Sequence, residues 1–138
     1  MFWNRKKPHK KAQILIAYLA VSMQLISGKL ESSSVKFGCQ IFILGMADML
    51  RQAEKLDWED FISIYSAVLE EFDLLPSIPI EDHVEKIGSI ASQNEDVERL
   101  MRQGAQSISM YIVEKDANAP TDLLGAIYFV EKNEASFV

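Results

Sequence analysis

Apolar residues recur along this chain at the three- and four-residue spacing of amphipathic helices. The clearest case follows Asp57, where the apolar positions are Trp58, Phe61, Ile62, Tyr65, Val68, Leu69 and Phe72. Asp57 can cap this helix, and Asp60 adds an acidic residue to its first turn. Pro76 and Pro79 must end it, because proline lacks a backbone donor and restricts the preceding residue. The pattern predicts a helix from about residue 57 to residue 73.

Two earlier segments are apolar over most of their circumference. In residues 11–27 one narrow helical stripe is polar or small, and it consists of Gln13, Ala17, Ala20, Gln24 and Ser27. In residues 35–55 the first half is equally apolar and carries Gly38 and Gly45 on one helix face, where another helix could approach closely. A helix that is apolar on nearly every side is usually buried, so we expect these two helices to form a central hairpin.

The second half of the chain predicts two or three further helices. Residues 81–91 form one, residues 92–94 are a break, and Asn94 caps another that runs toward Glu114. These two helices could instead be continuous. Residues 116–120 read as a loop, after which Thr121 caps a short last helix that precedes a frayed tail. No β-hairpin signal such as Asn-Gly or Asp-Gly occurs. We therefore predict an all-α, compact bundle of five or six helices.

Composition supports one folded domain. The chain has 138 residues, of which 49% are hydrophobic and 25% are charged, and this balance excludes intrinsic disorder. We assign residues 12–138 to a single helical domain and residues 1–11 to a flexible N-terminal arm. The single cysteine, Cys39, cannot form an internal disulfide and is expected to be a buried, inert thiol, which favours a cytoplasmic location.

The arm concentrates positive charge. It contains Arg5, Lys6, Lys7, Lys10 and Lys11 with no acidic residue. Since the whole chain has a formal charge of −6, the arm at +5 is attached to a body at −11. Such an asymmetry predicts that the arm docks on a surface, on a polyanion or on the acidic body itself.

Three partners for the arm can be compared. Phe2 and Trp3 beside the five cations are typical of a segment that lies on an anionic membrane. The arm could also contact the acidic helices of its own body or of a neighbouring subunit. Nucleic acid is disfavoured, because the acidic body would be repelled and no basic recognition helix follows. An arm with no specific role is the remaining alternative.

The arm and the apolar segment Ile14 to Ile26 together resemble a secretory signal, but the resemblance is incomplete. No clear small-residue cleavage pattern follows, and the apolar segment is shorter than the ~20 residues of a membrane span. We expect neither a cleaved signal nor a span.

Two residues, His83 and Asp48, are candidates for a metal-binding or a ligand-binding site. His83 lies among Glu81, Asp82 and Glu85, but no second histidine lies at ligand spacing, so a solvated acidic first turn is favoured over a metal site. Asp48 interrupts an apolar stretch and is predicted to be a buried carboxylate. It would either pair with Arg51 and Gln52 on its own helix or face a ligand or partner.

No phosphate-binding glycine loop or calcium-loop pattern is present in the sequence, and we expect no cofactor. The leading hypothesis is a non-catalytic interaction or regulatory module that self-associates as a homodimer, since two nearly all-apolar helices need covering. The alternative is a peripheral membrane protein anchored by the arm. The third is an enzyme or a ligand-binding bundle that uses Asp48.

Overall fold

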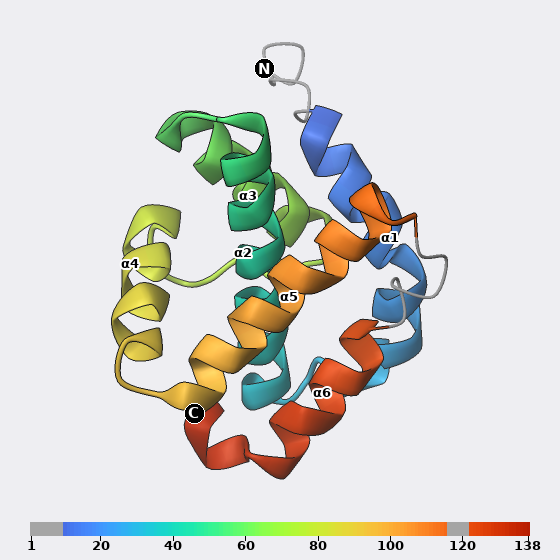
Figure 1. Ribbon diagram of the computed structural model, residues 1–138. Coiled ribbons are helices and arrows are strands. Elements are labelled where there is room, and N and C mark those ends of the chain that lie inside the picture. The colour runs from blue at the N-terminus through green and yellow to red at the C-terminus, as the bar shows by residue number, and fades with distance from the viewer. Residues whose placement is uncertain (1–9, 116–121) are drawn as a thin grey trace, which may run out of the picture.

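The computed structural model describes residues 10–115 and 122–138, and every regular element in these residues is helical (Figure 1). The elements are α1 (Lys10–Ile26), α2 (Ser33–Glu54), α3 (Trp58–Glu71), α4 (Ile80–Ala91), α5 (Glu95–Val113) and α6 (Asp122–Lys132), with short 3₁₀ helices at Ser27–Lys29 and Glu134–Phe137. The prediction of an all-α bundle of five or six helices is confirmed. Helices α4 and α5 are separate.

Side-chain caps set three of the helix starts. The Ser32 hydroxyl accepts from the backbone N–H of Val35, and the Asp57 carboxylate accepts from that of Asp60 at 2.8 Å. Asn94 accepts from the N–H groups of the second and third residues of α5. The caps predicted at Asp57 and Asn94 are therefore confirmed, whereas Thr121 lies outside the described residues.

Helix α2 alone is the centre of the bundle. It packs against α5, α6 and α3, and Figure 1 shows α5 crossing directly over it. Helix α1 lies at the side and packs more extensively on α3 than on α2. The expected central hairpin of the first two helices was therefore wrong. The physical reason is that α1 buries only one face, while residues 38–47 of α2 are buried in an unbroken run.

Glycines allow the close packing around α2 that the sequence predicted. A Cβ atom at Gly45 would overlap the backbone of Met101 on α5. A Cβ at Gly38 would lie 2.6 Å from the side chain of Val130 on α6. A larger residue at Gly45 would therefore overlap the backbone of α5, and one at Gly38 would require the Val130 side chain to shift.

The C-terminal tail is packed, so the frayed tail that the sequence suggested was wrong. Phe137 is 1% exposed and lies edge-on to Phe129, with ring centroids 6.3 Å apart. The Ser136 hydroxyl donates to the Asp96 carboxylate at 2.7 Å. An aromatic anchor and a hydrogen bond together hold the last turn on the start of α5 and the end of α6.

The segment between α3 and α4 is attached to the centre of α2. The Gln40 side-chain amide donates to the Leu74 carbonyl at 2.7 Å, and the Tyr65 hydroxyl donates to the Gln40 carbonyl at 2.9 Å. Cys39, on the same helix, is fully buried, and burial raises the pKa of its thiol to about 12. The expected burial of Cys39 is confirmed, and a thiol with a raised pKa stays protonated, which makes it a poor nucleophile.

Candidate functional site

The structure describes only the end of the basic arm. Phe2, Trp3, Arg5, Lys6 and Lys7 lie outside the described residues.

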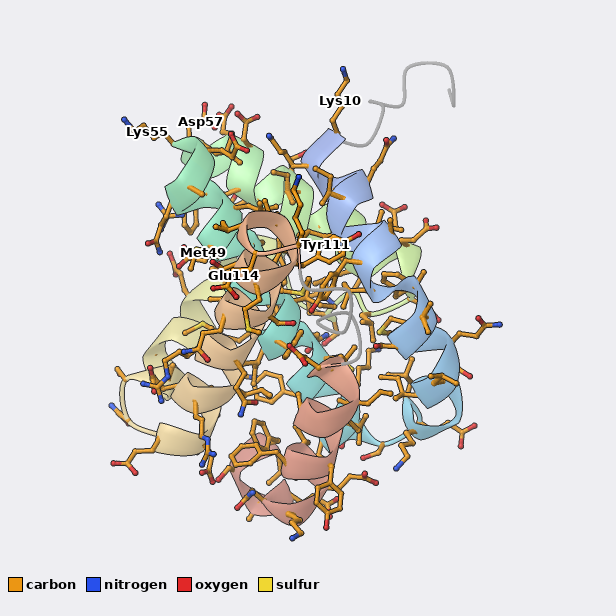
Figure 2. The ribbon with its side chains drawn as sticks, turned by 45° about the vertical axis from the view of Figure 1, so that its right-hand side comes forward. Lys10, Met49, Lys55, Asp57, Tyr111 and Glu114 are labelled. Atoms are coloured by element: carbon orange, nitrogen blue, oxygen red, sulfur yellow. The ribbon has the colours of Figure 1, made fainter. Side chains whose placement is uncertain are left out.

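Lys10 and Lys11 form the first turn of α1, so the helical domain begins two residues earlier than predicted. Figure 2 shows Lys10 at the end of the bundle where Lys55 and Asp57 also lie. The Lys11 ammonium pairs with the Glu54 carboxylate of α2 at 2.8 Å. This cation therefore contacts an acidic residue of its own body.

Asp48 is not a buried carboxylate, which corrects the prediction. Its side chain is 37% exposed, because the second half of α2 is amphipathic and Asp48 lies on its solvent side. The carboxylate forms an ion pair with Arg51 at 2.7 Å and accepts from the Gln52 amide at 2.8 Å. Of the two alternatives predicted from the sequence, the structure shows the pairing of Asp48 with Arg51 and Gln52 on its own helix.

His83 is buried, although the sequence favoured a solvated turn around it. Glu81, Asp82 and Glu85 are indeed exposed, but His83 is only 4% exposed. Its ring stacks on Tyr65, with centroids 6.2 Å apart and planes 9° apart. Burial, and then the charge of Lys86, lower the pKa of His83 to about 4. The imidazole is therefore neutral at neutral pH.

A signal for this burial was present in the sequence. His83 falls three residues after Ile80 and four before Ile87, which places it on the apolar face of α4. Across the residues described here, no group of three or more histidine, cysteine or acidic side chains is placed to hold a metal ion.

The exposed side of α1 is the candidate interaction surface. We call it the α1 face and define it by the exposed residues Gln13, Ile14, Ala17, Ala20, Val21, Gln24 and Leu25. Its three large apolar side chains are strongly exposed, at 40% for Ile14, 57% for Val21 and 65% for Leu25. The sequence has no charged residue from position 12 to position 28. The α1 face is therefore an uncharged, partly apolar surface that is exposed to solvent.

The sequence pattern did not predict this surface. It predicts a polar and small stripe that begins at Gln13, on a helix that is otherwise buried. The structure places that stripe at the surface, with Ile14, Val21 and Leu25 beside it. Periodicity alone could not show this, because both sides of α1 are rich in apolar residues.

The opposite side of α1 holds the helix firmly on the bundle. Tyr18 is 1% exposed, forms a buried hydrogen bond with Ser107 of α5, and meets Tyr111 edge-on with ring centroids 5.0 Å apart. Figure 2 shows Tyr111 on the part of α5 that approaches α1. The neighbouring end of α5 also exposes Ile112 and Val113, at 42% and 74%. The bundle therefore presents the α1 face as a fixed surface.

Length and composition would also allow the segment Lys10–Lys29 to cross a membrane. In this structure 39% of its most apolar stretch is buried inside the protein. One side of the segment packs on other helices, and the other side is the exposed α1 face.

Comparison of the chain with protein-family models, with curated proteins and with solved structures finds no match.

Proposed function

We propose that this protein is a non-catalytic helical interaction module that self-associates through the α1 face. The observation that carries the proposal is the exposure of Ile14, Val21 and Leu25 on an uncharged side of a helix whose other side is fixed in the core. Exposed apolar side chains grouped on one element are typical of a contact surface.

The α1 face has the spacing of a helix-pairing seam. Ile14, Ala17, Val21 and Gln24 alternate at three and four residues, as the inward positions of paired helices do. Ala17 and Ala20 are small, so a second helix can approach closely between the larger side chains.

A second copy of the chain fits this surface. In an antiparallel pair centred near residue 19, each Ala17 lies opposite Val21 of the other copy, and each Ile14 lies opposite Gln24. A two-fold axis makes both contacts twice, as in most homodimers.

The expected affinity is modest. Covering a half-exposed Ile, Val or Leu contributes about 1 kcal/mol, so six such side chains contribute about 6 kcal/mol. Association costs on the order of 4–15 kcal/mol in lost freedom. Even at the lower end of this cost, these six side chains leave only about 2 kcal/mol, so the rest of the α1 face must add to the free energy of association. The dimer is therefore expected to be weak and to form at millimolar protein concentrations.

Sedimentation equilibrium of the full chain over that concentration range tests the proposal. Wild type should show a monomer–dimer equilibrium that Val21→Glu abolishes, because the substitution buries an unpaired charge. Ile78→Glu is the matched control, since Ile78 is 39% exposed and lies outside the α1 face. A monomer at all concentrations, or equal loss of the dimer in both variants, would contradict the proposal.

A second candidate function is reversible attachment to an anionic membrane. The observation that favours it is that the first thirty residues contain no acid, so the basic arm and the α1 face could meet headgroups and acyl chains together. Co-sedimentation with vesicles that contain phosphatidylserine tests it. Binding should disappear when Arg5, Lys6, Lys7, Lys10 and Lys11 become glutamine and should also weaken in Val21→Glu. Equal recovery with neutral vesicles would exclude this function.

A further inference from the structure

A pocket of about 360 Å³ lies where α2, residues 75–78 and the first turns of α4 meet. Phe37, Leu75 and Ile78 give it apolar walls, and its polar lining includes Gln40 and His83. Its volume falls at the lower end of the range of about 300–1,000 Å³ that is usual for small-molecule sites. The pocket lies away from the α1 face and is independent of the proposed self-association.

The charged side chains that line the pocket are both cations. Lys36 and Lys86 contribute them, and neither forms an ion pair with any residue in the described ranges. The Lys86 ammonium lies 5.9 Å from the centroid of the Phe37 ring, which holds it beside an apolar wall. In a chain with a formal charge of −6, this is a local positive field that attracts an anion.

His83 provides a second, independent indication of a ligand. It is 4% exposed, and its Nε2 atom is buried without a hydrogen-bond partner among the described residues. More than about 90% of buried polar groups in proteins form a hydrogen bond. An unsatisfied imidazole nitrogen beside a pocket therefore indicates that a bound molecule completes its hydrogen bonding. A polar ligand atom could supply that partner after a small shift of the ring.

The walls of the pocket are held in place by contacts that do not involve a ligand. Gln40 is fixed by its bond to the Leu74 carbonyl, and its own carbonyl accepts from Tyr65. Tyr65 in turn stacks on the His83 ring, and Phe37 meets the same ring edge-on, with ring centroids 6.4 Å apart. A site preorganised in this way loses little entropy on binding.

We propose that this pocket binds a small organic carboxylate. The carboxylate lies between Lys36 and Lys86, the carbon chain packs against Phe37 and Ile78, and the Nε2–H of His83 donates a hydrogen bond to a carboxylate oxygen. The apolar walls select an organic acid over an inorganic anion, and the two lysines select an acid over an alcohol.

Hexanoate is a suitable probe, with 1-hexanol and inorganic phosphate as comparison ligands. Each is titrated into the full-length protein while backbone and imidazole nitrogen shifts are followed by NMR. Hexanoate should bind and shift the His83 imidazole resonances, and hexanol and phosphate should bind at least tenfold more weakly.

A double variant, Lys36→Gln with Lys86→Gln, should weaken hexanoate binding at least tenfold. Lys55→Gln with Lys132→Gln is the matched control, because it removes the same charge from two exposed lysines that do not line the pocket. The proposal is overturned by any of three results: unmoved His83 resonances, equal weakening in both double variants, or phosphate binding as tightly as hexanoate.

Discussion

Gly45 of α2 and Gly104 of α5 meet at one helix crossing, each facing the backbone of the opposite helix. An ideal Cβ at Gly45 would lie 2.8 Å from the carbonyl carbon of Met101, and one at Gly104 would lie 2.9 Å from that of Phe42. The partner atoms belong to backbone inside helices and cannot swing away as a side chain could. The crossing between the central helix and α5 is therefore sensitive to a single methyl group.

We predict that Gly104→Ala destabilises the protein by about 2 kcal/mol or more, because the steric cost exceeds the gain of about 1 kcal/mol in helix propensity. Gly88→Ala is the control, since Gly88 lies inside α4 and a Cβ there meets nothing within 4 Å. It should stabilise by up to about 1 kcal/mol. Urea unfolding midpoints of both variants measure the difference, and shifts of the same sign would contradict the packing described here.

The bundle architecture was only partly readable from the sequence. Periodicity and caps located the helices, and Asp57 and Asn94 marked two starts correctly. The pairing of helices was not readable, because α1 and α2 have similar apolar content and only the structure shows that α2 is enclosed. Gly104 belongs to a helix with a clear apolar stripe, yet its contact with Phe42 depends on a partner 62 positions away in sequence.

The stability of the protein should fall as pH decreases from about 6.5 to about 4. Burial lowers the pKa of His83 from 6.5 to about 4, so within this window the unfolded chain takes up a proton that the folded chain does not. Each pH unit corresponds to 1.36 kcal/mol, which gives a loss of about 3 kcal/mol by pH 4. Unfolding free energies measured at half-unit steps should show this slope.

His83→Phe should remove that part of the slope, because phenylalanine keeps a ring beside Tyr65 but has no titrating group. Direct NMR titration of the His83 imidazole in the wild type gives a check that does not depend on how the variant folds. A midpoint near 6.5 in the folded protein would contradict the assignment.

Phe137→Ala should destabilise the protein by about 3 kcal/mol, since a buried aromatic ring at the chain end leaves a cavity when truncated. Val138→Ala is the neighbouring control, because Val138 is 89% exposed and should change stability by less than about 0.5 kcal/mol. Thermal unfolding of the two variants separates a packed tail from a frayed one. Equal melting temperatures for both would support fraying.

Asp48→Asn should change stability by no more than about 0.5 kcal/mol, because the ion pair with Arg51 is solvent-exposed. The small difference from wild type should vanish in 1 M NaCl, where the Debye length is about 3 Å. Chemical unfolding at low and high salt makes the comparison. A loss above about 2 kcal/mol at both salt concentrations would indicate a role that the exposed pair does not explain.

The chemical sites were harder to predict than the helices. Asp48 drew attention because its sequence neighbours are apolar, but its position on the helix surface depends on where the other helices pack. The acidic neighbours of His83 favoured a solvated turn, although its spacing from Ile80 and Ile87 places it on the buried face. For His83 the position on the helix predicts burial correctly. For both Asp48 and His83 the neighbouring residues in the sequence predict the wrong degree of burial.

The order in which the elements surround α2 affects how the protein is made. It packs most extensively against α5, and α3, α6 and the turn that contains Phe137 cover its other sides, so most of the residues that bury α2 are synthesised after it. On a ribosome, the apolar surface of α2 emerges long before these segments do. The native core can close only after α5, α6 and Phe137 have left the exit tunnel, and until then the apolar surface of α2 stays accessible to chaperones and to aggregation.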